Sequence, residues 1–196
     1  MYKRQAQGRI TSVPHDPRYP VDTWWDLGGD GTPVVYTQQI KSMTHVIDYQ
    51  ETFGQPYTED VRQLLERTTY RWGTHYLPHD GINRPKQAQS NLSAMEQLYA
   101  LGLRNIQIVP RVERVIDGIQ EMRRRFSELK IDKTKCFLLI DHLTKYKKVW
   151  SPVLAAFTDV PRHDVHSHGA DALRQWAQWP LDTGHVNGHH KQRIGA

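Results

Sequence analysis

The stretch "VDTWWDLGGDGTPVVYTQQ", residues Val21–Gln39, decides the fold. An aromatic and β-branched run ends at Asp26, a glycine-rich segment follows, and a second β-rich run begins at Pro33. Two such runs on either side of a short glycine-rich turn predict a pair of antiparallel strands. A third run follows another short turn. The sequence therefore predicts an antiparallel meander with strands at Val21–Leu27, Pro33–Ile40 and Met43–Glu51.

Further along the chain, the hydrophobic spacing changes from period two to the helical period. Helices are predicted within residues 57–73, 90–102, 112–129 and 166–179, and strands at His75–Asp80 and Asn105–Pro110 separate the first three. The run from Cys136 to Ile140 fits a strand or part of a helix. This order predicts an α/β domain with a mixed sheet, in which three antiparallel strands precede parallel ones and helices cover both faces.

The chain length and composition are those of one globular domain. There are 196 residues, of which 38% are hydrophobic. Proline-rich residues 1–20 are expected to be an N-terminal arm, residues 21–180 the domain, and residues 181–196 a mobile tail. The single cysteine, Cys136, excludes an intrachain disulfide framework and a cysteine-based zinc site. No apolar run approaches the roughly 18 residues that span a bilayer.

The net charge of +5 favours an acidic partner, with nucleic acid first. Acidic residues also stand at the ends of predicted elements: Asp26 ends the first strand, Asp80 ends the fourth, and Asp171 begins the last helix. Taken singly, they are explained by a turn, an Asp-Gly turn and a helix N-terminus. If they meet, their mutual repulsion requires cations, and hard oxygen ligands favour Mg²⁺ or Mn²⁺.

Three segments, "DTWWDLGGDGTPVVYTQQ", "HYLPHDG" and "HSHGADALRQWA", resemble in order and spacing the acidic motifs in the nuclease domain of tailed-phage large terminase subunits. The resemblance runs from about Gly8 to Trp179 and implies an RNase H-like fold. It implies that Asp26, Asp80 and Asp171 are the catalytic residues and the ligands of two Mg²⁺ or Mn²⁺ ions. It also implies that the segment "CFLLIDHLTKYKKVW" is helical.

The resemblance implies an endonuclease that cuts double-stranded DNA with little sequence preference during genome packaging, in the host cytoplasm. Its partners would be a packaging ATPase domain or subunit, the small terminase subunit and the portal. The sequence contains no G-x-x-x-x-G-K-[ST] loop, so we expect a nuclease half without ATP hydrolysis. The remaining alternatives are another RNase H-like nuclease of the resolvase or transposase type, and a non-catalytic module that binds DNA or docks on the motor.

Other polar residues are assigned secondary roles. Asp30, one residue closer to Asp26 than is usual in the family, is a possible ligand through water, and His168 and His79 are possible neighbours of the metal site. Arg84 and Lys86 are predicted to contact the DNA backbone. The arginines at 123–125 are expected to form a solvated helix face.

Overall fold

A seven-stranded mixed sheet forms the centre of the molecule in the computed structural model, which describes residues 8–28, 31–84, 91–153, 155–162 and 164–179. The strand order is β1-β7-β4-β3-β2-β5-β6. The strands are β1 (Ile10–Thr11), β2 (Val21–Trp25), β3 (Gly31–Ile40), β4 (Met43–Phe53), β5 (Trp72–Leu77), β6 (Ile106–Ile108) and β7 (Leu129–Asp132). The predicted antiparallel pairing of β2, β3 and β4 is confirmed, and β5 and β6 continue the sheet in parallel beside β2.

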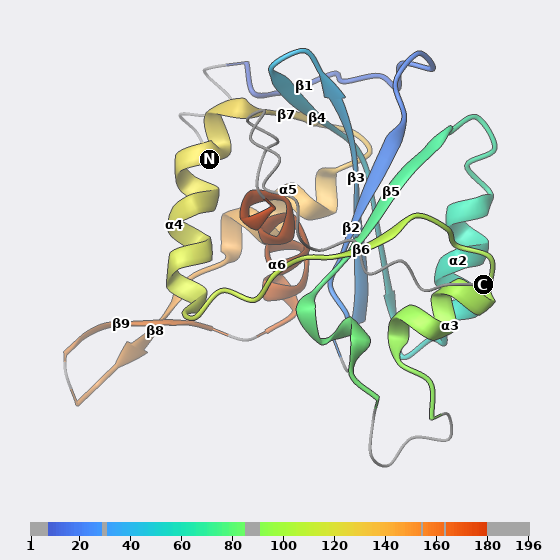
Figure 1. The fold of residues 1–196 in the computed structure, drawn as a ribbon. Coiled ribbons are helices and arrows are strands. Elements are labelled where there is room, and N and C mark those ends of the chain that lie inside the picture. The colour runs from blue at the N-terminus through green and yellow to red at the C-terminus, as the bar shows by residue number, and fades with distance from the viewer. Residues whose placement is uncertain (1–7, 29–30, 85–90, 154, 163, 180–196) are drawn as a thin grey trace, which may run out of the picture.

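Helices cover both faces of this sheet, as predicted (Figure 1). One face carries α4 (Val115–Arg125), α5 (Phe137–Lys145) and α6 (Val165–Gln178), and the other carries α2 (Tyr57–Leu65) and α3 (Ala94–Ala100). The two short 3₁₀ turns are η1 (His79–Ile82) and η2 (Phe126–Glu128). Because both faces are covered, the first eight residues of β3 are all buried, and the core consists of two apolar layers.

Two adjacent tryptophans of β2 show how the sheet divides these layers. Alternation along the strand predicts that they point to opposite faces and that one of them packs in the core. In the structure both are buried: Trp24 packs in the layer under α4, α5 and α6, and Trp25 in the layer under α2 and α3. Each indole N–H donates to a threonine hydroxyl, at 2.8 Å to Thr37 and 2.7 Å to Thr23, so neither burial leaves an unsatisfied donor.

The structure adds strands that periodicity does not predict. Within the expected arm, β1 pairs in parallel with β7, and the backbone N–H of Val13 donates to the Asp132 carboxylate at 2.7 Å. The prediction of helix from residue 136 is confirmed for α5 but wrong for the end of that segment. There the chain forms a hairpin of β8 (Lys148–Ser151) and β9 (Ala156–Pro161), which projects away from the sheet (Figure 1).

The arginine run at the end of α4 is not wholly solvated, which corrects the prediction. Arg124 is exposed and pairs with Glu121, but Arg125 is only 3% exposed. Its guanidinium lies 4.2 Å from the Trp176 ring and donates from Nη1 to carbonyls at the C-terminal end of α6, at 2.9 Å to Ala177 and 3.0 Å to Trp179. A buried cation thus satisfies carbonyls that the helix itself leaves without donors.

Among the described residues, no helix is long and apolar enough to cross a bilayer. The predicted mobile tail, Asp30 and Lys86 lie outside the described residues.

Candidate active site

The three predicted acidic residues come from three separate elements. Asp26 directly follows β2, and its backbone N–H still donates to the Pro33 carbonyl at 3.1 Å, which continues the pairing with β3. Asp80 lies in η1, just beyond β5. Because β2 and β5 are parallel neighbours, these two acids lie beyond the same edge of the sheet. The residues that follow the acids pack closely, since a Cβ added at Gly81 would lie 3.2 Å from Cδ1 of Leu27.

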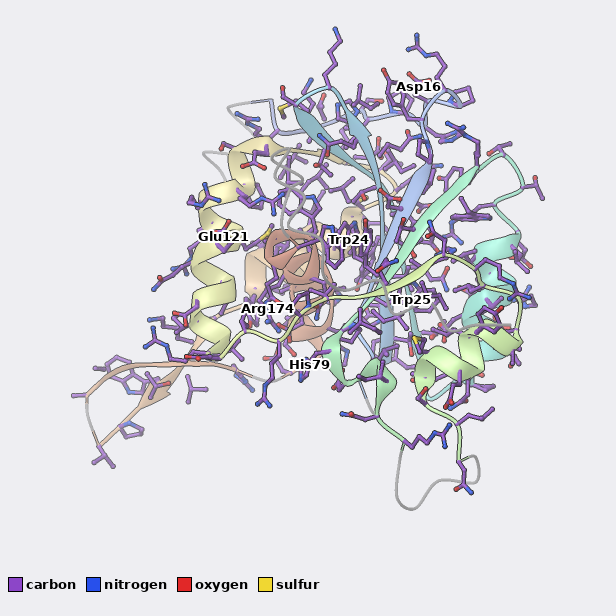
Figure 2. All side chains as sticks on the ribbon, in the orientation of Figure 1. Asp16, Trp24, Trp25, His79, Glu121 and Arg174 are labelled. Atoms are coloured by element: carbon purple, nitrogen blue, oxygen red, sulfur yellow. The ribbon has the colours of Figure 1, made fainter. Side chains whose placement is uncertain are left out.

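The third acid, Asp171, lies in α6, which packs against β2 and β3. In the view of Figure 2, Arg174 of α6 is labelled near the middle of the molecule and His79 of η1 a little below it. The charged groups that change the pKa of Asp26 also come from these two elements, α6 and η1. Burial, followed by the charges of Asp171 and Asp80, raises the pKa of Asp26 from 3.8 to about 7, whereas Arg174 and His168 act in the opposite direction. Burial and the like charges of two other carboxylates therefore both disfavour the ionised form of Asp26.

Arg174 is a functional neighbour that the sequence reading missed. One turn after Asp171 on α6, its Nη2 and Nε lie 3.0 and 3.1 Å from Asp171 Oδ1, and both side chains are largely buried. The three-residue spacing on a helix was the available signal. The guanidinium partly neutralises the acids and lowers the pKa of Asp26, which makes it the protein's own counter-ion at this site.

The acids share an electrostatic environment but are not drawn together around one point. Within the described part of the chain, no three His, Cys, Asp or Glu side chains form a group that could hold a metal ion in the observed conformation. Asp80 is exposed, whereas Asp26 and Asp171 are half-buried. The donor chemistry, three carboxylates with a residual like-charge repulsion, fits a hard divalent cation. Binding of one cation by all three acids therefore requires side-chain rearrangement.

The secondary residues lie in different surroundings. His168 is one turn before Asp171 and its side chain is 3% exposed, with Nδ1 at 3.3 Å from Oε1 of Glu51. The sequence reading missed Glu51, because a polar residue at a strand end reads as exposed. His79, beside Asp80, is exposed. Arg84 is exposed and its guanidinium pairs with Glu96, at 2.5 Å.

The architecture described above, a mixed sheet with three antiparallel strands followed by parallel ones and helices on both faces, is that of an RNase H-like domain. Comparison of the sequence with protein-family models and with curated proteins gives no match. Comparison with solved structures gives matches to phage large terminases.

Two of these matches are isolated nuclease domains. That of the bacteriophage P22 large terminase has a TM-score of 0.62 at 12% identity, over 86% of this chain and 85% of its own. The nuclease domain of the bacteriophage SPP1 large terminase g2p, solved with bound Mn, has a TM-score of 0.56 at 14% identity, over 84% of this chain and 91% of its own.

A third match is the large terminase of a thermophilic bacteriophage, with a TM-score of 0.63 at 16% identity. The match covers 88% of this chain but only 42% of that protein. The chain has the fold of the nuclease domains of phage large terminases, and the predicted resemblance is confirmed at this level.

Proposed function

We propose that this chain is a metal-dependent endonuclease that cuts double-stranded DNA with little sequence preference during phage genome packaging. The observation that carries the proposal is the electrostatic environment of Asp26, just beyond β2, whose pKa is raised by burial and by the carboxylates of Asp171 in α6 and Asp80 in η1. A site of this charge is poor at binding phosphate unless cations neutralise it. The fold, shared with domains that are named as nucleases, supports the same conclusion.

Asp26, Asp80 and Asp171 are the proposed ligands of two divalent ions, Mg²⁺ or Mn²⁺. The SPP1 domain was solved with bound Mn and the phage G20c nuclease with bound magnesium. When bound, such ions supply a nucleophilic water at neutral pH and stabilise charge on the leaving oxygen. The chain's own contribution is to place carboxylates on three rigid elements and to lower their repulsion with Arg174 until cations replace it.

Secondary groups complete this proposal. His168 is the buried neighbour of the acids, Asp30 would be a secondary ligand through water, and His79 would orient a ligand beside Asp80. Arg84 and Lys86 are the proposed contacts to the phosphate backbone, which give affinity without sequence specificity and weaken with salt. For Arg84 this contact requires exchange of its partner Glu96 for phosphate.

The packaging partners follow from the family. The match covers less than half of the large terminase from the thermophilic phage. By the resemblance, the proposed partners are an ATPase domain or subunit, the small terminase subunit and the portal, and the proposed location is the cytoplasm of the host. In a packaging complex the ATPase would deliver and restrain the DNA. We therefore expect the isolated domain to cut weakly and without specificity.

The test is cleavage of supercoiled plasmid in Mn²⁺, with EDTA as the blank. Asp80→Ala and Asp171→Asn should each lower the rate at least about 100-fold, because each removes a ligand. Asp117→Asn, an exposed acid of α4 paired with Arg114, is the matched control and should cut normally. Full activity of Asp80→Ala contradicts the assignment.

The same assay separates the other functions. Preferential cutting of a four-way junction over linear duplex would favour a resolvase-type enzyme. DNA binding without cleavage, together with no heat of Mn²⁺ binding in calorimetry, would favour a non-catalytic DNA-binding or motor-docking module.

A further inference from the structure

A cavity of about 270 Å³ lies between α4, α5 and α6, next to the candidate active site. Most of the residues that line it are apolar and come from these helices and from η2: Ile119, Met122, Phe126, Leu143 and Ala170. Arg174 of α6 also lines it, and the same guanidinium lies 3.0 Å from Asp171. The cavity and the candidate active site therefore share Arg174.

Tyr146 brings a hydroxyl to this cavity. The residue is the C-cap of α5, its backbone N–H donates to the His142 carbonyl at 2.8 Å, and its side chain lines the cavity together with Arg174. The hydroxyl oxygen is buried and has no hydrogen-bond partner among the described residues. Burial of a hydroxyl without a partner costs free energy. Phenylalanine would fill the same space without this cost, which indicates that the hydroxyl serves a contact other than packing.

The charges that act on this hydroxyl belong mainly to the candidate active site. Burial, followed by the charge of Asp171, raises the pKa of Tyr146, and Arg174 acts in the opposite direction. Asp26 and Asp164 add to the rise. The phenol therefore stays protonated at neutral pH, as an uncharged group that can donate a hydrogen bond. The carboxylate that acts on it most strongly is that of Asp171.

Asp171 can accept a further hydrogen bond. Nη2 and Nε of Arg174 both face Oδ1, at 3.0 and 3.1 Å, and within the described part of the chain no hydrogen bond reaches Oδ2. An ionised carboxylate has two oxygens with about four acceptor positions. The two neighbouring donors differ in charge. The guanidinium of Arg174 repels a cation bound by Asp171, whereas a neutral hydroxyl can hold the carboxylate without that repulsion.

We propose that Tyr146 is a positioning residue, whose hydroxyl donates a hydrogen bond to Asp171 when that carboxylate binds a divalent cation. The proposal rests on the proposed nuclease function, since the cation site is part of it. The hydroxyl then orients the carboxylate toward the cation, as hydrogen-bonded neighbours of metal ligands commonly do. Loss of such a neighbour typically weakens metal binding about 10–100-fold.

Tyr146→Phe tests the proposal because it removes the hydroxyl and keeps the ring. Tyr70→Phe is the matched control. Tyr70 is a buried tyrosine of the core layer on the other face of the sheet, and its hydroxyl donates to Oδ2 of Asp48 at 3.2 Å. The two variants lose the same group, which is hydrogen-bonded in Tyr70 and has no described partner in Tyr146.

The first measurement is thermal unfolding in EDTA. Tyr146→Phe should melt at or above the temperature of the wild type, because an apolar group replaces a buried hydroxyl without a compensating bond. Tyr70→Phe should melt below it, since the Asp48 carboxylate loses a donor. If Tyr146→Phe also melts below the wild type, the hydroxyl already has a structural partner without the cation, and the proposal is overturned.

The second measurement is calorimetric titration of the domain with Mn²⁺. Tyr70→Phe should bind within about twofold of the wild type, and Tyr146→Phe should bind about 10–100-fold more weakly. Equal affinities of Tyr146→Phe and wild type overturn the proposal, and a raised KM for plasmid in that case would assign the hydroxyl to a phosphate of the DNA. A wild type that binds no Mn²⁺ overturns the proposed nuclease function and this proposal with it, so the two failures are distinguishable.

Discussion

Replacing Asp26 by asparagine should stabilise the metal-free domain while abolishing its proposed activity. The Asp26 carboxyl has an ordinary pKa of 3.8 in the unfolded chain and a pKa of about 7 in the fold, because burial and the charges of Asp171 and Asp80 oppose its ionisation. The folded state therefore binds the proton more tightly than the unfolded state does. The corresponding contribution to stability is complete below about pH 4 and is lost as the pH rises to about 7.

The size of this effect follows from the two pKa values. Their difference corresponds to about 4 kcal/mol at pH 8, an upper limit. Asp26 is only half-buried, and water screens part of the repulsion, so about 1–3 kcal/mol is the expected gain for Asp26→Asn. For a chain of this size that gain is roughly a 3–10 °C rise in melting temperature.

The assay is thermal unfolding in EDTA at pH 5 and at pH 8, with Asp117→Asn as the control at an exposed, paired acid. The advantage of Asp26→Asn should be larger at pH 8, and Mn²⁺ should raise the melting temperature of the wild type but not of the variant. The reasoning is refuted if the variant melts at or below the wild type at pH 8, or if its gain is the same at both pH values.

Two further predictions concern the packing of α6. Arg125→Ala should cost about 2–4 kcal/mol in denaturant unfolding, because it removes a buried cation from helix carbonyls, whereas Arg124→Ala should stay within about 0.5 kcal/mol; equal losses would contradict the burial of Arg125. Gly169→Ala should cost about 1–2 kcal/mol, since the overlap of the new methyl with the Tyr49 hydroxyl outweighs the better helix propensity of alanine; a more stable variant would contradict this close contact.

The central strands could be predicted because their signals are local. The meander of β2, β3 and β4 follows from β-branched runs and glycine-rich turns, and the helices α4 and α6 from helical periodicity. Leu129–Asp132 gave no such signal, since four residues after a helix are too few to show alternation. It becomes β7 only because β4 and the N-terminal β1 pair with it, from more than 80 residues away.

In the candidate site, too, some residues could be predicted from the sequence and others could not. Asp26 and Asp80 could be found from their places after predicted strands, and Asp171 from the resemblance of its helix. Glu51 could not be found, because its burial depends on helices that begin more than 80 residues later. The counter-ion Arg174 is visible only once Asp171 is known to face the sheet.

The measurement that tests the central claim most directly is a crystal structure of the domain soaked in Mn²⁺, with anomalous data collected at the manganese edge. The account predicts anomalous density at the edge of the sheet, between the side-chain oxygens of Asp26, Asp80 and Asp171, with Arg174 displaced from Asp171. Saturating Mn²⁺ with no density there, or density held by other residues, would contradict it.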